Sequence, residues 1–424
     1  MRYQAVGALA VSGLLVAGLA ACTNETASTT TGDGKVALTW ASVSSEKPAT
    51  DAVIKAYQAA NPDVTITATT ADVDNYQTTL RTQLSSGTAP DVFFVWAGDG
   101  NPMAMTVLQK AGLIEDLSSL DFVKNVPGGV KPVVQIDGKT FTAPITYAGI
   151  GAAYNMNAMK EGGYTVPTTW TEVIALCKKA KTDGKSAFAL AGGTPWNTQL
   201  IPYALTPTLV YGPTPDFAAQ MSAGKTTFAN SEWKTAFDKY SEMQDSGCFQ
   251  KGNLGTAYED ALKLVSTGDA LASVQVNASI AAIAQTAPAG TEFSLEPLPA
   301  NDDPASTRMA GATGAAYGIN AKAKQKDAAL KFLAYLASPE GAAVYAEATK
   351  AIPAIPNDSF KTDPALAPFI RYQKEGKTDP FMDQLWPNAK VQQTHFEVAQ
   401  QLLAKKASST EALAKMDAAY AEGA

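Results

Sequence analysis

Apolar and polar residues alternate in two stretches near the start of the chain, which predicts two short β-strands. The alternating apolar positions are Val36, Leu38 and Trp40 in the first stretch and Val64 and Ile66 in the second. Residues 91–96 differ because every residue after Asp91 is apolar, which is typical of a strand buried on both faces. The pattern therefore predicts three strands in the first part of the chain.

Apolar residues recur at helical spacing after each alternating stretch. These positions are Val53, Ile54 and Tyr57 in the first helix and Tyr76, Leu80 and Leu84 in the second. Thr50 can cap the first helix, which ends at Asn61, and residues 85–87 end the second. Strands that alternate with helices predict a parallel sheet, whose ligands bind beyond the carboxyl ends of the strands. The loops after Trp40 and Trp96 are therefore expected at a ligand-facing edge.

The chain changes character at residues 141–154, which are extended, apolar and rich in glycine, without a helical period. We interpret this stretch as a hinge strand that leaves one lobe for the next. A second α/β region follows, where Thr169 and Glu172 form a capping box. The helix after this box carries Val173, Leu176, Cys177 and Ala180 on its inner face.

A turn-rich connector at residues 297–304 precedes a glycine-rich loop and strand at residues 311–320. A helix is expected over residues 326–337 and another after Ser338, before amphipathic helices complete the chain. About 390 residues follow residue 34, which is more than one hydrophobic core usually serves. We therefore expect an α/β protein with two lobes.

The first residues have the pattern of a lipoprotein signal peptide, residues 1–21. Arg2 supplies the positive charge, residues 5–19 form an apolar run, and Leu19 is followed by the small Ala20 and Ala21 directly before Cys22. This lipobox predicts lipidation of Cys22 and attachment to the outer face of a bacterial cytoplasmic membrane, with residues 22–34 as a flexible tether. The alternative is an ordinary secretory signal with an accidental cysteine. We expect no transmembrane helix later in the chain.

The formal net charge of −7 comes without clusters of lysine and arginine, which argues against nucleic acid as a partner. Outside the cytoplasm, Cys177 and Cys248 are expected to form a disulfide, the alternative being two separate buried thiols. With a single histidine, His395, the chain has too few soft ligands for zinc. We expect no metal and no cofactor.

Seven segments, taken in order, resemble those of the extracellular solute-binding lipoproteins of ATP-driven carbohydrate importers, the maltose-binding-protein-like solute-binding family 1. They are residues 38–42 (LTWAS), 85–92 (SSGTAPDV), 96–98 (WAG), 112–117 (GLIEDL), 192–196 (GGTPW), 268–270 (GDA) and 350–353 (KAIP). The resemblance covers nearly the whole chain, and it is the order of the segments, together with the lipobox, that makes it specific.

The resemblance implies a two-lobed periplasmic-binding-protein-like fold with a hinge and discontinuous lobes. Lobe one would comprise residues 35–143 plus 300–346, and lobe two residues 144–299 plus 347–424. It also implies a monomeric receptor, not an enzyme, that holds an oligosaccharide between the lobes and delivers it to the permease subunits of an ABC importer. The chain departs from relatives at residues 275–279, which lack their glycine and tryptophan, so one stacking aromatic is absent or supplied elsewhere.

A sugar site needs flat aromatic faces for the apolar C–H surfaces and amides or carboxylates for the hydroxyl pairs. Trp196 is the leading candidate, because residues 192–195 before it cannot continue a helix or strand. Asn197 beside it can both donate and accept hydrogen bonds. The alternative is that Trp196 only covers the core. The further candidates, each of which could instead be a core or solvated loop residue, are Trp40, Ser42, Ser44, Glu46, Trp96, Asp99, Asn101, Tyr147, Gln275, Asn277, Gly311, Gly314 and Trp386.

Other ligands and activities remain open from the sequence. The same fold could bind a peptide, a polyamine or a metal ion, with paired tyrosines in the cleft as the mark of iron. An anchored glycoside hydrolase would need only two carboxylates, but no pair stands in a recognisable catalytic setting. A Ser-His-Asp hydrolase would require His395, and no GxSxG motif is present.

Overall fold

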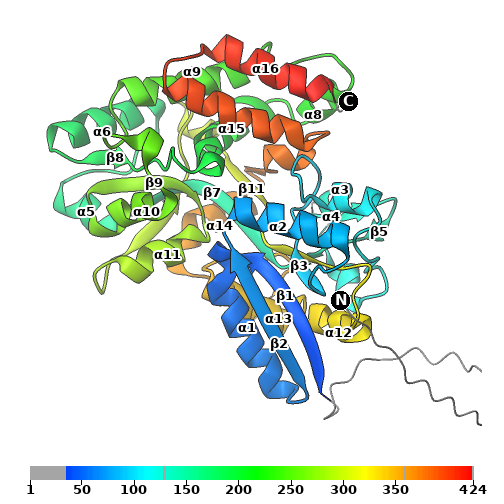
Figure 1. The fold of residues 1–424 in the computed structure, drawn as a ribbon. Coiled ribbons are helices and arrows are strands. Elements are labelled where there is room, and N and C mark those ends of the chain that lie inside the picture. The colour runs from blue at the N-terminus through cyan, green and yellow to red at the C-terminus, as the bar shows by residue number, and fades with distance from the viewer. Residues whose placement is uncertain (1–34, 128–129, 358–359, 423–424) are drawn as a thin grey trace, which may run out of the picture.

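The computed structural model describes residues 35–127, 130–357 and 360–422, which form two α/β lobes built on separate sheets (Figure 1). This is the expected fold class. The signal peptide, Cys22 and the tether lie outside the described residues. Within those ranges, no helix has the length and apolar character that a membrane crossing needs.

The first lobe contains two separate parts of the chain. Its elements are β1 (Val36–Val43), η1 (Ser44–Glu46), α1 (Lys47–Ala60), β2 (Val64–Ala71), α2 (Val73–Ser86), β3 (Val92–Phe94), α3 (Met105–Lys110), η2 (Asp121–Asn125), α4 (Lys131–Val134), β4 (Gln135–Ile136), β5 (Lys139–Thr140), β6 (Ala143–Pro144), β12 (Ala316–Ile319), α12 (Lys326–Leu336) and α13 (Pro339–Ala348). The sheet order is β2-β1-β3-β12-β6. Because β1 pairs in parallel with β2 and β3, the parallel sheet predicted from the alternating pattern is confirmed.

Helix α1 begins at Lys47, before the cap expected at Thr50. Pro48 lies in its first turn, where a helix does not need the missing amide donor. The Thr50 hydroxyl instead donates to the carbonyl of Glu46 at 3.0 Å, so Thr50 lies inside the helix. The earlier start places the buried Glu46 directly at the end of η1, at the carboxyl edge of the sheet.

The second lobe contains the remaining elements. They are β7 (Thr146–Asn155), α5 (Met156–Glu161), α6 (Trp170–Thr182), β8 (Ser186–Phe188), η3 (Pro195–Gln199), α7 (Leu200–Thr206), η4 (Pro207–Tyr211), α8 (Phe217–Ser222), α9 (Trp233–Asp245), η5 (Asn253–Gly255), α10 (Tyr258–Thr267), β9 (Ala270–Val276), α11 (Ser279–Thr286), β10 (Phe293–Glu296), η6 (Pro304–Ser306), β11 (Met309–Thr313), β13 (Ile352–Pro353), η7 (Pro364–Leu366), α14 (Ala367–Lys374), β14 (Thr378–Asp379), η8 (Met382–Leu385), α15 (Ala389–Leu403) and α16 (Ser409–Ala421).

The long strand β7 is the centre of the second sheet, whose order is β14-β11-β7-β9-β8. Strands β10 and β13 also pair with β7. Nearly all of β7 is buried, because separate apolar clusters pack in this lobe around the sheet. The C-terminal helices α15 and α16 lie beside α9 over the same lobe (Figure 1).

The described chain crosses between the two lobes three times. The first crossing, at Ile145 between β6 and β7, falls within the expected hinge stretch. The second is at residues 314–315, between β11 and β12, and the third is at residues 349–351, between α13 and β13. The boundary expected at residue 300 is therefore wrong, because β11 pairs with β7 in the second sheet.

Cys177 on α6 and Cys248 after α9 form a disulfide, which is the pairing expected from the sequence. Both residues are fully buried in the apolar cluster of the second lobe. The amide of Phe188 in β8 donates to the carbonyl of Cys248 at 3.0 Å. The bridge therefore ties α6 to the segment that lies alongside the edge of the second sheet.

Candidate functional site

A cleft separates the carboxyl edge of the first sheet from the second lobe. Its deep part, which we call the inner chamber, has a cavity volume of about 190 Å³ and is partly open to solvent. The residues that line the inner chamber are Val43, Ser45, Glu46, Val73, Asp74, Gln77, Phe94, Trp96, Ala97, Asn101, Thr146, Ala148, Ile150, Trp196, Gln199, Leu200, Tyr203, Tyr258, Val276, Asn277, Ala278, Thr313, Gly314, Ala315, Thr349, Ala351, Phe381, Asp383, Gln384, Gln392 and Phe396.

A second hollow, which we call the outer chamber, adjoins the inner one. Both are lined by Trp196 and Tyr258 of the second lobe and by Val73 and Asp74 of the first. The outer chamber adds exposed charged residues, which are Lys47, Asp51, Asp72 and Glu259. The two chambers therefore form one continuous cleft with an aromatic pair, Trp196 and Tyr258, at their junction.

The Glu46 carboxylate lies on the first-lobe side of the inner chamber, at the end of a buried hydroxyl chain. Tyr345 donates to Glu46 Oε2 at 2.7 Å. The Tyr345 hydroxyl is 2.8 Å from that of Tyr317, which is 2.7 Å from Ser42 Oγ. Burial raises the pKa of Glu46, although hydrogen bonds from Tyr345 and Ser45 act in the opposite direction. The chain holds Glu46 as a fixed hydrogen-bond acceptor at the cleft.

Aromatic side chains line the cleft from both lobes. In the first lobe, Trp96 packs edge-on against Phe94, with ring centroids 4.8 Å apart. In the second lobe, Trp196 contacts Tyr258 at 5.0 Å, and Phe381 and Phe396 also line the inner chamber. Both Trp96 and Trp196 are only partly buried, so each retains an open face for a ligand. Such faces suit the C–H surface of a sugar ring.

Amide and carboxylate groups connect the two lobes across the inner chamber. Asn101 of the first lobe donates to Gln392 Oε1 on α15 at 3.1 Å. Gln392 Nε2 in turn donates to Asp383 Oδ2 at 3.0 Å and to Gln199 Oε1 at 3.3 Å. Gln77 donates to Asn101 Oδ1 at 3.3 Å. This polar network covers one wall of the chamber and fixes its side chains before any ligand arrives.

The structure brings about half of the residues predicted from the sequence to the cleft. Those that line the inner chamber are Glu46, Trp96, Asn101, Trp196, Asn277 and Gly314, and Ser44 lines the outer chamber. Asn197 and Gln275 lie buried behind Trp196, where the Asn197 amide donates to Gln275 Oε1 at 3.0 Å. They support the wall, and neither lines either chamber.

Two of the predicted tryptophans belong to the hydrophobic cores. Trp40 is 1% exposed and packs against Tyr317 and Phe332 in the first lobe. Trp386 is 3% exposed and packs against Phe228 in the second lobe. Neither lines the cleft, because aromatic neighbours from distant parts of the chain cover both rings. Ser42 is likewise buried, as the end of the hydroxyl chain described above.

Three further predicted residues lie away from the ligand-facing surface. Tyr147 stacks on Phe369 and donates to the carbonyl of Gly311 at 3.0 Å, and both Tyr147 and Gly311 line a separate hollow beside the crossing strands. Asp99 accepts the amide of Gly100 at 2.9 Å and lines neither chamber. These residues shape the hinge and the loop after β3.

Several cleft residues were missed from the sequence. The most important are Tyr203, Tyr258, Phe381, Asp383, Gln384 and Gln392. A usable signal existed for Asp383, because it is the single acid in residues 381–386, where Gln384 is the one other polar residue. An acid in such a run must find a partner or a function.

The described residues contain no group of three or more His, Cys, Asp or Glu placed to hold a metal ion. Tyr203 and Tyr258 both line the inner chamber, and burial raises the pKa of each, to about 12 for Tyr258. His395 lies buried among aromatic rings, and burial lowers its pKa to about 3. It is a neutral core residue and cannot act as a base in the cleft.

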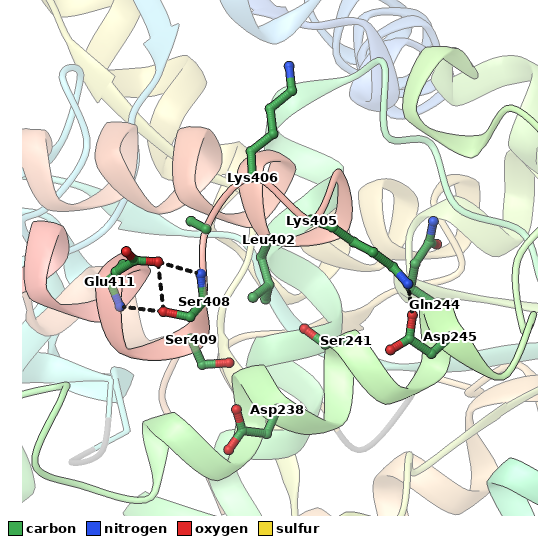
Figure 2. A pocket seen from close by; sticks show the side chains of 11 residues that line it. Asp238, Ser241, Gln244, Asp245, Leu402, Lys405, Lys406, Ser408, Ser409 and Glu411 are labelled. Carbon is green, nitrogen blue, oxygen red and sulfur yellow. Dashed lines mark hydrogen bonds and ion pairs between the residues drawn. The ribbon is translucent and has the colours of Figure 1, made fainter.

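Another concave surface lies between α9 and the turn that joins α15 to α16 (Figure 2). Its polar groups already interact with one another, since Lys405 pairs with Asp245 at 2.5 Å and Ser408 forms a capping box with Glu411. It carries no aromatic side chain. We therefore regard it as ordinary surface.

Two α/β lobes, joined by three chain crossings and enclosing a cleft of this size, define the class of hinged ligand-binding proteins. The sequence matches the model of a family described as bacterial extracellular solute-binding protein, over residues 41–343. The chain belongs to this family.

Relatives and solved structures agree with this assignment. The chain is 27% identical to a multiple sugar-binding protein of Streptococcus mutans, over 79% of this chain and 78% of the relative, and 23% identical to a melibiose/raffinose/stachyose-binding protein of Bacillus subtilis, over 74% and 72%. The fold is similar to that of RafE in complex with raffinose, with a TM-score of 0.75 and 21% identity over 91% of this chain and 99% of RafE. A Bacillus licheniformis sugar transporter protein in complex with stachyose has a TM-score of 0.73 and 20% identity, over 92% of this chain and all of that one.

Proposed function

We propose that this protein is an extracellular receptor that binds an oligosaccharide in the cleft and delivers it to an ABC importer. The observation that carries the proposal is the composition of the inner chamber. Aromatic side chains from both lobes, Trp96 and Trp196 among them, line the same chamber as a network of amides and carboxylates that includes Asn101, Gln392 and Asp383. This combination matches the alternating C–H faces and hydroxyls of a neutral sugar.

The names of the relatives support a sugar of the melibiose, raffinose and stachyose series as the first class to test. Two connected chambers suit a ligand of more than one ring. Closure of the lobes on such a ligand is favoured only by as much as the closed state binds it more tightly. The receptor binds the sugar without chemical change.

A polyamine is the second candidate, and a specific observation favours it. Among the described residues that line the inner chamber, three are acidic and none is lysine or arginine: Glu46, Asp74 and Asp383. Burial raises the pKa of both Glu46 and Asp383, however, so neither carboxylate is prepared for a cation by its surroundings. The aromatic faces do not separate the two candidates, because an aromatic ring also attracts an ammonium group placed over its face.

We further propose that Cys22 carries a lipid that holds the receptor at the outer face of the membrane, and that the receptor acts as a monomer with the permease. The lipobox and the core-free tether support the anchor. Expression of the full chain in a bacterial host, followed by mass spectrometry of residue 22, tests this part. A Cys22→Ala variant is expected in the soluble fraction, whereas an unmodified Cys22 in the intact protein would contradict the anchor.

The ligand class is tested by thermal unfolding of residues 35–424 with melibiose, raffinose, stachyose, xylotriose, a tripeptide and spermidine. A ligand at 100 times its dissociation constant stabilises the folded state by about 2.7 kcal/mol. We expect a shift with one sugar series, and chromatography of that mixture should show the sugar unchanged. A shift with spermidine or peptide alone would overturn the sugar assignment.

A further inference from the structure

Three residues other than glycine have a positive φ in the part of the chain that the structure describes. They are Asp137 at 50°, Lys350 at 52° and Lys405 at 57°. This left-handed region brings the β-carbon of an L-residue too close to a carbonyl oxygen, and aspartate is among the few residue types that tolerate it. Lysine is not, so Lys350 and Lys405 are strained and call for an explanation.

Both lysines end a helix in the same way. Lys350 is the second residue after α13, and Lys405 is the second residue after α15. In each case the amide of the next residue donates to a carbonyl five residues earlier, at 2.9 Å after α13 and at 2.8 Å after α15. This is the Schellman motif, whose left-handed residue is usually glycine. The two sites therefore share residue type, motif and strain.

Their locations differ. Lys350 is the middle residue of the third crossing, where α13 of the first lobe leads into β13 of the second. Its neighbours Thr349 and Ala351 both line the inner chamber. Lys405 instead lies in the turn between α15 and α16, within the second lobe. The backbone at Lys350 therefore sets the direction in which the chain passes from one lobe to the other beside the cleft.

Two contacts hold Lys350 from the second lobe. Asn277 donates its side-chain amide to the carbonyl of Lys350 at 3.3 Å, and Lys350 Nζ pairs with Asp363 Oδ2 at 2.9 Å. Asn277 is fully buried and is itself fixed to β7, because its Oδ1 accepts the amide of Gly149 at 2.9 Å. Asp363 caps η7 by accepting the amide of Ala365 at 2.9 Å. The strained residue is thus tied to two anchored side chains.

The residue type at position 350 decides how many directions this crossing can take. A lysine that is held at positive φ has only a small allowed area of φ and ψ, whereas glycine moves freely between positive and negative φ. A hinge turns through φ and ψ changes at a few residues at the ends of its elements. Lys350 therefore restricts the angles available to the lobes, and glycine would permit more of them.

We propose that Lys350 is a positioning residue of the hinge. Its left-handed backbone, held by Asn277 and Asp363, keeps the third crossing at the angle at which both lobes line the inner chamber. This raises the affinity for ligand, because the observed dissociation constant is the intrinsic one divided by the fraction of molecules in the competent arrangement. The effect on sugar affinity rests on the proposed function, whereas the effect on the lobe angle does not.

The test replaces each strained lysine by glycine. Lys350→Gly removes the restriction at the crossing together with an ion pair, and the matched control Lys405→Gly removes the same strain and the ion pair with Asp245 within one lobe. Lys350→Arg keeps both the restriction and the charge, so it serves as the conservative variant.

Three quantities are measured for each protein. Small-angle X-ray scattering without ligand and at saturating sugar gives the radius of gyration, and isothermal titration calorimetry gives the dissociation constant for raffinose. If wild-type protein prefers another sugar of the panel, that sugar replaces raffinose. The melting temperature is measured without ligand.

Lys350→Gly should have a larger radius of gyration than the wild type without ligand, because its lobes also adopt more open angles, and the two should agree at saturating sugar. Its affinity should fall about 3- to 10-fold, as expected when the competent fraction drops to about 0.1–0.3 of the wild-type value. Lys405→Gly and Lys350→Arg should match the wild type in both measurements. The two glycine variants should change alike in melting temperature, because each loses the same strain and one ion pair near the surface.

Two results overturn the inference while the proposed function stands. One is a Lys350→Gly protein whose radius of gyration without ligand equals that of the wild type. The other is an equal loss of affinity in Lys350→Gly and Lys405→Gly, because the lysines would then serve only the fold. If wild-type protein binds no sugar of the panel, the proposed function fails, and the comparison of the radii of gyration without ligand still decides the inference.

Discussion

The inner and outer chambers of the cleft share an aromatic junction but differ in how they treat polar groups. In the inner chamber, Asp383 and Gln392 are buried and their positions are fixed by hydrogen bonds. In the outer chamber, Lys47 and Asp51 are exposed and pair with each other at 2.6 Å. The inner chamber holds buried, preorganised polar groups such as Asp383 and Gln392, and the outer chamber exposes its charged groups to water.

Because of this difference, we expect the two chambers to discriminate between ligands to different degrees. A buried polar group that a wrong ligand leaves unpaired costs the full desolvation penalty, whereas an exposed group recovers its water. The inner chamber is therefore expected to select the identity of a ring. The outer chamber is expected to tolerate different lengths and linkages in the rest of the sugar.

The largest predicted effect comes from weakening the scaffold that both chambers share. Replacing Cys177 and Cys248 by alanine opens the bridge between residues 71 positions apart, which the chain-entropy model values at about 4 kcal/mol of unfolding free energy. Guanidinium unfolding followed by circular dichroism measures this loss. Raffinose affinity at 25 °C should stay within about twofold, because neither cysteine lines a chamber. A large loss of affinity would show that the bridge also shapes the cleft.

The next largest effect is expected at Trp196, which lies at the junction of the two chambers. Trp196→Ala should cost about 2–3 kcal/mol of raffinose binding, about 30- to 150-fold, because it removes an aromatic face that both chambers use. Trp386→Phe is the matched control, because its ring packs in the core. That variant should lower the melting temperature and leave affinity nearly unchanged. Equal affinity losses in both variants would contradict the assignment of Trp196 to the cleft.

Acidity should weaken binding through the inner chamber. Burial raises the pKa of Asp383 to about 6, and a hydroxyl donates best to the ionised carboxylate. Since the proton competes with the sugar, raffinose affinity should fall about tenfold between about pH 7 and about pH 5. Because the pKa of Asp383 is raised in the folded state, the ligand-free protein should gain stability over the same range as the pH falls.

Calorimetry at both pH values measures how raffinose affinity changes with pH, and Asp383→Asn should remove most of that change. The other acids that face the inner chamber are Glu46 and Asp74, and burial raises the pKa of each. Any pH dependence of raffinose affinity that remains in the variant is attributed to Glu46 and Asp74. His395 does not contribute, since it is already neutral at these pH values. Affinity that is independent of pH in the wild type would contradict an ionised Asp383 as the acceptor.

The smallest effect is expected in the outer chamber. Glu259→Gln alters an exposed charge at the rim, where substitutions usually change binding by less than about 1 kcal/mol. A two- to threefold change at most is expected for raffinose, and less for melibiose, which is shorter. Competition binding with both sugars measures the difference. A loss as large as that of Asp383→Asn would remove the proposed contrast between the chambers.

The local pattern was sufficient to predict the elements of the first lobe. Period-two and helical spacing identified β1, α1, β2 and α2, and the apolar run at residues 91–96 identified β3, because these patterns report directly on which face is buried. The helix start at Lys47 was missed, since proline in a first turn can replace the side-chain cap expected at Thr50. The crossing at residues 314–315 could not be located, because it depends on which sheet β11 joins.

The site was predicted less completely, and the tryptophans explain why. Trp40, Trp196 and Trp386 each lie next to a predicted loop, so the local sequence does not show which of them reaches the cleft. What separates them is the aromatic neighbours supplied from distant parts of the chain, such as Tyr317 over Trp40. Asp383 was missed for the same reason, because its place at the cleft depends on Gln392, which comes from a different element, α15.

The crossing strands carry one more consequence. Hydrogen bonds join them at the point where they pass between lobes, with Ile145 donating to the Ala315 carbonyl at 2.9 Å, Gly314 to Thr146 at 2.9 Å and Ala354 to Ile145 at 2.9 Å. A ribbon joined in this way bends as a unit but cannot slip in register. We therefore expect the lobes to move mainly by a change in the angle between them. A transporter that recognises this angle distinguishes the ligand-bound receptor from the empty one without contacting the ligand.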